Sequence, residues 1–290
     1  MNTTSKPESG TANSYINTPT RTIEVNGSRF AYRQLGTDTG TPVILLNHLG
    51  ANLDNWDPRV VDGLAATHRV ITFDNRGVGA STGSTPSTIA AMARDAVAVV
   101  RALGLTRVDL VGFSLGGFVT QVIAQDEPQL VRRIVLAGTG PAGGVGIDKV
   151  TRVTIKDMLR AALSFSDPKR YLFFTRTANG QRAAREFLAR LKERTEARDA
   201  AISPWTFRAQ LKAIHAWGRR QPQDLTRIVA PVLVVNGEAD RMVPSSNTRD
   251  LARRLPNSEL ELYPDAGHGG AFQYHDAFVT KVRHFLEQTP

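Results

Sequence analysis

Five short runs of mostly apolar residues limit the folds open to this chain. Each run is bounded by polar or amphipathic sequence, and together they cover residues 43–46, 69–73, 108–111, 134–137 and 232–235. Continuous apolar runs of this length are typical of strands buried on both faces of a parallel sheet. Helical patterns separate the runs at residues 87–103 and 115–125, and two more follow the last run at 245–255 and 271–286. This alternation predicts an α/β fold with helices on both faces of a mostly parallel sheet.

The order of these patterns also predicts the domain organisation. Residues 1–20 hold few large apolar side chains and are expected to form a flexible tail. An Asn26-Gly27 turn before an alternating segment at 29–35 indicates a hairpin, and residues 259–263 indicate a weaker last strand. Residues 141–230 contain only helical patterns, at 149–163, 167–176, 180–198 and 204–219. We therefore expect a core of residues 21–140 and 231–290, with residues 141–230 inserted as a helical cap.

Composition excludes several classes of protein. The 290 residues include no cysteine, which removes disulfides, thiolate metal sites and cysteine nucleophiles. A chain of this length buries about three quarters of its surface on folding, so one core needs no cross-links. No apolar run approaches the roughly 20 residues of a membrane span. The first 20 residues lack the apolar stretch of a secretory signal, so we expect a cytoplasmic protein with no membrane partner.

The net charge of +9 raises the question of an acidic partner. Residues 141–230 hold 18 Lys and Arg against 8 Asp and Glu, so the excess belongs to the cap alone. Along 182–198 the basic residues alternate with Glu at helical spacing, which is typical of a solvated helix face. This pattern does not form the unbroken basic patch that nucleic-acid binding requires. We expect no nucleic-acid partner. The preferred interpretation of the basic cap is a solvated surface without a functional role, and the alternative hypothesis is that it favours an anionic substrate.

The sequence Gly112-Phe113-Ser114-Leu115-Gly116-Gly117 joins a predicted strand directly to a predicted helix. This G-x-S-x-G pattern in a strand–turn–helix setting is typical of a nucleophile elbow. Glycine is needed on both sides of the serine because larger side chains would collide with the neighbouring strand and helix. The turn pushes Ser114 out at the end of the strand, where the helix N-terminus favours developing negative charge. Ser114 is therefore the predicted nucleophile.

A base and an acid follow Ser114 in the order that a serine nucleophile needs. Asp240 comes after the run at 232–235, and His268 lies between glycines after the last predicted strand. His268 is predicted to accept the Ser114 proton, and Asp240 to orient the imidazole and stabilise its positive charge. Glu238 and Asp265 are the alternative acids. Asp240 is preferred because it lies in the loop where this order of residues places the acid.

Taken together, these motifs resemble the α/β-hydrolase family over residues 22–288. The marks are Asn47-His48-Leu49-Gly50, the Asp74–Ser81 loop, the elbow, and the loops that carry Asp240 and His268. The resemblance implies an eight-stranded sheet, a cap over the site and an oxyanion hole of two backbone N–H groups. Leu115 supplies the first donor. Family members usually carry His-Gly where this chain has Asn47-His48, which puts Leu49 at the second donor position.

The remaining candidates concern the pocket. His48 is expected either to bond structurally or to lie near the pocket, and Phe113, Trp205 and Trp217 are candidate pocket residues. The sequence has no P-loop, no dinucleotide-binding motif and no cluster at metal-ligand spacing, so we expect no cofactor and no metal.

The leading hypothesis is a serine hydrolase that cleaves a small carboxylic ester or lactone through an acyl-enzyme. Cofactor-free haloperoxidases, acting as perhydrolases, are also similar to this chain, although they usually carry an aromatic residue in place of Leu49. Hydrolysis of a carbon–carbon bond by the same residues is a third hypothesis, and a non-catalytic receptor on this fold is a fourth.

Overall fold

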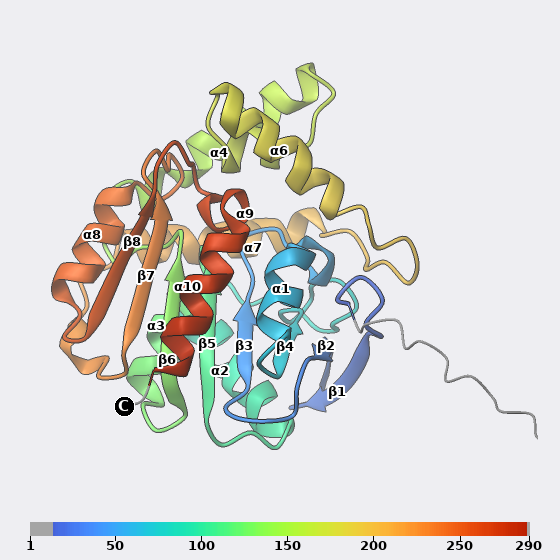
Figure 1. The fold of residues 1–290 in the computed structure, drawn as a ribbon, viewed down its shortest axis with the longest axis vertical. Helices are drawn as coiled ribbons and strands as arrows, with labels where there is room; N and C mark the ends of the chain where they lie inside the picture. The colour runs from blue at the N-terminus through green and yellow to red at the C-terminus, as the bar shows by residue number, and fades with distance from the viewer. Residues whose placement is uncertain (1–13, 289–290) are drawn as a thin grey trace, which may run out of the picture.

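The computed structural model describes residues 14–288, which form a central sheet of eight strands flanked by helices (Figure 1). The strand order is β1-β2-β4-β3-β5-β6-β7-β8. β2 runs antiparallel to β1 and β4, and all other neighbours are parallel. The strands are β1 (Arg21–Val25), β2 (Ser28–Leu35), β3 (Val43–Leu46), β4 (Val70–Phe73), β5 (Val108–Phe113), β6 (Val131–Ala137), β7 (Val232–Gly237) and β8 (Ser258–Tyr263).

The helices of the core cover both faces of this sheet. In Figure 1, α1 and α10 lie in front of the strands and α2 and α3 behind them. The central strands β3, β4 and β5 are buried along their whole length, as their apolar sequences predict. The core helices are α1 (Pro58–Ala65), α2 (Ile89–Ala102), α3 (Leu115–Asp126), α8 (Ser245–Arg254), α9 (Gly270–Gln273) and α10 (His275–Glu287).

Four α-helices lie between β6 and β7 in the chain, within the segment predicted to be a cap. They are α4 (Val150–Leu163), α5 (Lys169–Phe173), α6 (Ala178–Arg190) and α7 (Pro204–Gly218). Figure 1 shows α4 and α6 standing above the sheet, over the carboxyl ends of its central strands. Short 3-10 turns are at Leu53–Asn55, Ile147–Lys149 and Leu225–Arg227.

Several predicted helix boundaries are wrong, and the helix predicted at 167–176 spans only Lys169–Phe173. The helix predicted from Ser87 has Thr88 as its N-cap, because the Thr88 hydroxyl accepts from the Ala91 N–H. The single helix predicted at 271–286 is divided into α9 and α10 at Tyr274. The helix predicted at 180–198 ends at Arg190, and the chain then turns to bring Arg194 against the core.

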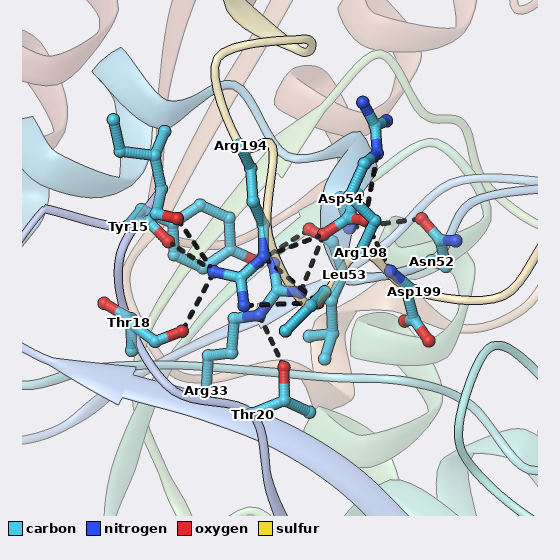
Figure 2. Close-up of polar contacts among 12 residues, drawn as sticks. Tyr15, Thr18, Thr20, Arg33, Asn52, Leu53, Asp54, Arg194, Arg198 and Asp199 are labelled. Atoms are coloured by element: carbon cyan, nitrogen blue, oxygen red, sulfur yellow. Dashed lines mark hydrogen bonds and ion pairs between the residues drawn. The ribbon is translucent and has the colours of Figure 1, made fainter.

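The prediction of a flexible tail over residues 1–20 is wrong for residues 14–20, and residues 1–13 lie outside the described residues. Tyr15 is buried, and its hydroxyl donates to the carbonyl oxygen of Leu53 at 2.7 Å. The guanidinium of Arg194 donates to the carbonyl oxygens of Ile16 (2.9 Å) and Thr18 (3.0 Å). The segment is ordered because a buried arginine of the cap satisfies its backbone (Figure 2).

The interpretation of 182–198 as a solvated face is likewise wrong for Arg190 and Arg194, both of which are buried. Arg194 Nε lies 3.7 Å from Asp54, whose carboxylate also accepts from Arg33 (2.7 Å) and from the Asp199 N–H (2.7 Å), as Figure 2 shows. A buried cation is stable only with such partners. Part of the positive charge of the cap is therefore used to fasten it to the core.

Candidate active site

Ser114 lies in the sharp turn between β5 and α3, with φ of 55° and ψ of −113°. A positive φ is strained for a residue other than glycine. Its N–H donates to the Ala137 carbonyl (2.9 Å) and its own carbonyl accepts from the Thr139 hydroxyl (2.9 Å), so the turn is held against the carboxyl end of β6. A Cβ at Gly116 would overlap the carbonyl oxygen of Leu46. Glycine is required there because β3 passes directly beside the turn.

The structure brings Ser114, His268 and Asp240 into one hydrogen-bonded chain. His268 Nε2 lies 2.9 Å from Ser114 Oγ, and His268 Nδ1 lies 2.7 Å from Asp240 Oδ2. All three residues are buried, with 2–6% of their surface exposed. Asp240 Oδ1 also accepts from the N–H groups of Met242 (2.8 Å) and Val243 (3.0 Å), so the carboxylate is fixed from both sides. In this geometry Nδ1–H donates to Asp240, and Nε2 can accept the serine proton.

The two alternative acids lie elsewhere. Glu238 is exposed. Asp265 accepts from the Thr177 hydroxyl (2.9 Å) and the Asn179 amide (3.2 Å), both next to α6 in the cap. Asp265 therefore ties the cap to the loop that carries His268, and it does not contact the imidazole.

In the loop after β3, the Leu49 N–H is a free backbone donor at the position that the sequence indicated. The His48 N–H donates to Asn47 Oδ1 (3.0 Å), and the Gly50 N–H donates to Gln210 Oε1 of α7 (2.8 Å). Within residues 14–288, neither the Leu49 N–H nor the Leu115 N–H has an acceptor. Two unbonded N–H groups flanking a nucleophile are what an oxyanion hole needs.

His48 fixes this loop through its side chain. Its Nδ1 lies 2.8 Å from the Leu49 carbonyl oxygen, and since a carbonyl only accepts, Nδ1 carries the proton. The ring packs edge-on against Phe113 and Phe173, at centroid distances of 5.5 and 5.1 Å. Burial, reinforced by the nearby Lys169 cation, lowers the pKa of His48 to about 3. His48 is therefore neutral near pH 7, and its buried Nε2 has no hydrogen-bond partner among residues 14–288.

A cavity of about 200 Å³ opens over Ser114 between the core and the cap. Its polar lining comes from His48, Ser114, Thr154, Asp167, Lys169 and His268. Its large apolar lining comes from Leu49, Met158, Leu172, Phe173, Phe207 and Met242. Lys169 Nζ lies 3.5 Å from Asp167, so the two charges of the lining partly cancel.

Of the four candidate pocket residues, His48 alone lines this cavity. Phe113 packs behind it, 5.1 Å from the His268 ring. Trp217 of α7 is buried against the core, where it stacks on Phe118 at 5.5 Å and donates to the Gly140 carbonyl at 3.3 Å. Trp205 is 77% exposed because it lies on the outer face of α7. Proposing both tryptophans for the pocket was wrong: α7 turns Phe207 toward the cavity and Gln210 toward the oxyanion loop instead.

Two further features bear on the class of protein. Within residues 14–288, no helix combines the length and the apolar character that crossing a bilayer requires. The same residues contain no group of three or more His, Asp or Glu side chains placed to hold a metal ion.

Comparison with known proteins agrees with this geometry. An alpha/beta hydrolase fold protein from Chitinophaga pinensis is 39% identical, with a TM-score of 0.90 over 96% of this chain and all of its own. A Mycobacterium tuberculosis protein, provisionally named a non-heme bromoperoxidase, is 29% identical over 86% of this chain and 94% of its own. Est816, described as an N-acyl homoserine lactone degrading enzyme, is 28% identical, with a TM-score of 0.73 over 91% of this chain and all of its own.

The family resemblance and the fold class predicted from the sequence are both confirmed by these matches. Residues 41–273 match the family model of the alpha/beta hydrolase fold, which is well over half of the chain. The chain belongs to the α/β-hydrolase family.

Proposed function

We propose that this protein is a serine hydrolase that cleaves a small carboxylic ester or lactone through an acyl-enzyme. The observation that carries the proposal is the hydrogen-bonded triad at the floor of the cavity. Ser114 Oγ lies 2.9 Å from His268 Nε2, and His268 Nδ1 lies 2.7 Å from Asp240 Oδ2. A serine hydroxyl becomes a useful nucleophile only when a base takes its proton, and this chain provides the base.

Acylation begins when Ser114 Oγ attacks the substrate carbonyl carbon and passes its proton to His268 Nε2. The carbonyl oxygen becomes an oxyanion, which accepts from the N–H groups of Leu49 and Leu115. The tetrahedral intermediate collapses, the bond to the leaving oxygen breaks, and that oxygen takes the proton from His268. Water then attacks the acyl carbon while His268 takes one of its protons. That proton returns to Ser114 Oγ as the carboxylic acid leaves.

The cavity favours a small acyl group. Its volume of about 200 Å³ lies below the roughly 300–1,000 Å³ that is typical of sites for drug-sized ligands. The apolar side chains of α4, α5 and α7 surround the space above Ser114, so the acyl chain meets carbon on most sides. We propose short or branched acyl groups and small lactones as substrates.

Labelling by a fluorophosphonate probe tests the reaction type directly. The wild-type protein should be labelled, and Ser114→Ala should not be, because the probe bonds to the activated hydroxyl. A variant of an exposed serine, Ser246→Ala, is the matched control and should label like the wild type. If the folded wild-type protein is not labelled, the hydrolase proposal fails.

The hypothesis of an anionic substrate rests on Lys169, the one lysine or arginine in the cavity lining. A substrate carboxylate would replace Asp167 as its partner. A panel of aryl esters with and without a carboxylate, assayed with the wild type and Lys169→Met, tests this. The KM for the carboxylate ester should rise severalfold in the variant while the KM for the neutral ester stays the same. An equal response of both esters would contradict the hypothesis.

Peroxide in place of water is the second candidate reaction, which the resemblance to the Mycobacterium tuberculosis protein supports. The same triad would form an acyl-enzyme from acetate or an ester, and hydrogen peroxide would then release a peracid. Bromination of a dye by peroxide, acetate and bromide, dependent on Ser114, would support it. Ester cleavage without such bromination would support hydrolysis by water.

A further inference from the structure

The cap helix α4 has an exposed apolar face. Ile155, Leu159 and Leu163 follow one another at intervals of four residues and are 52%, 62% and 85% exposed, and Phe165 after the helix is 99% exposed. At 100° per residue these helical positions lie on one side of α4. The buried residues of the helix, Val150, Thr154, Asp157 and Ala161, lie on the other side. An exposed apolar face of this kind indicates a site of interaction.

The charged residues on the exposed side of α4 are all cations. Arg152, Lys156 and Arg160 are exposed between the apolar side chains. The one acid of the helix, Asp157, is buried and accepts from Arg241 at 2.7 Å. Arg160 also stacks over the partly buried Tyr171, with its guanidinium carbon 5.1 Å from the ring centre. The face therefore combines apolar side chains with three positive charges that α4 itself does not neutralise.

We propose that this face of α4 docks on the surface of an anionic lipid aggregate. The apolar side chains would enter the boundary of the acyl region, while the three cations meet the negative headgroups. A second copy of this chain fits less well, because symmetric pairing would place the same cations against one another. The inference goes beyond the proposed reaction, and it replaces the expectation from the sequence that the protein has no membrane partner.

The position of α4 beside the cavity suggests what docking on a lipid surface would do for the reaction. Thr154 and Met158 of α4 line the cavity over Ser114, and the apolar face begins one residue away from each. A docked lipid surface would therefore lie beside the cavity opening, on the cap side of the molecule (Figure 1). Substrates dissolved in the lipid would reach the site without crossing bulk water.

Flotation with vesicles tests the inference in the full-length Ser114→Ala protein, so that binding is read independently of any reaction. Phosphatidylglycerol vesicles should carry the protein at low salt, and phosphatidylcholine vesicles should carry it much less. Raising the salt should weaken binding because screening shortens the reach of the cations. Absence of binding to phosphatidylglycerol at low salt overturns the inference and leaves the labelling test of the reaction unaffected.

Two variants and a matched control locate the surface. Leu163→Ser with Phe165→Ser removes apolar contact, and Arg152→Gln with Lys156→Gln removes charge. The charge variant should lower the partition coefficient about fivefold for each cation lost. The control pair Arg227→Gln with Val229→Ser alters one exposed cation and one exposed apolar residue just before β7, at the amino end of that strand and so opposite to the end over which α4 lies. It should bind like the parent protein.

The same variants distinguish a lipid surface from a second copy of this protein as the partner of the α4 face. Since all the altered side chains are exposed, the melting temperatures of the variant proteins should match that of the parent protein. If the protein dimerises without lipid, and the α4 variants abolish the dimer, the face belongs to a second copy and the inference is overturned. Equal loss of vesicle binding in the control pair would also overturn it.

Discussion

The guanidinium of Arg190 donates to both carboxylate oxygens of Asp57, and so joins the end of cap helix α6 to the start of core helix α1. The contacts are 3.0 Å from Nε to Oδ1 and 2.7 Å from Nη2 to Oδ2, and the Asp57 side chain is 0% exposed. Arg190 also donates to the Phe272 carbonyl at 3.1 Å. Asp57 is at the same time the N-cap of α1, through the Arg59 N–H at 3.0 Å.

Arg190→Met should lower the free energy of unfolding by about 3–5 kcal/mol, because removing one partner leaves a buried charge uncompensated. Urea denaturation at neutral pH measures the change. Arg185→Met, in the same helix but exposed, is the matched control and should change the value by less than about 0.5 kcal/mol. Similar effects of the two variants would show that the pair does not hold the cap.

Asp240→Asn should reduce kcat by about 10⁴-fold with little change in KM, since an amide N–H facing Nδ1 favours the wrong imidazole tautomer. The comparison needs a substrate found in the ester panel. Glu238→Gln is the control, because that exposed carboxylate lies two residues away and does not touch His268. A large loss in the Glu238 variant would transfer the role of the acid to that residue.

Gln210→Leu should lower kcat by about tenfold, which is less than the loss of an oxyanion donor itself. The variant removes the acceptor of the Gly50 N–H and frees the loop that presents the Leu49 N–H. Gln210→Glu keeps an oxygen at the same place and should restore most of the rate. A loss of stability with unchanged kcat would mean that Gln210 only packs the cap.

The His48 ring predicts a pH dependence of stability. The unfolded side chain binds a proton below pH 6.5, whereas the folded one does so only near its pKa of about 3. Between these values the unfolded state binds more protons, so stability falls as pH falls, by at most about 1.4 kcal/mol per pH unit. Urea unfolding of wild type and His48→Asn across this range should show the difference between them shrinking toward low pH. Parallel curves would contradict a buried neutral His48.

The sheet and the residues around Ser114 could be predicted from local sequence. The apolar runs of β3, β5 and β7 allow no exposed face, and the glycines around Ser114 fit one kind of turn. His268 stands between glycines after a strand, so its neighbours in the sequence give it no apolar helix or strand face that would explain it as a core residue. Local patterns suffice here because the chemistry and the backbone geometry come from the same few residues.

The attachments of the cap could not be predicted in this way. Gln210 meets Gly50 across 160 positions of sequence, and Arg190 meets Asp57 across 133. Helical periodicity places charged residues on the outside by default, because burial of a charge depends on a partner that the pattern does not contain. Helical periodicity also does not distinguish Trp205 from Trp217, because each needs a tertiary partner to be buried. In the structure Trp205 is exposed and Trp217 is in the core.

The helices of the cap are attached to the core with unequal strength, and this difference bears on the side from which a substrate enters. Buried arginines lock α6 and the segment after it, whereas α4 is tied through Arg241, whose side chain is 45% exposed. The helix α5 is held more firmly than α4, because the Phe173 carbonyl accepts from the Gly269 N–H at 2.8 Å and the Phe173 side chain is buried. We therefore expect α4 to move more readily than α6, and the substrate to enter on the α4 side. Changing which molecules reach Ser114 therefore calls for substitutions in α4, with α6 left intact.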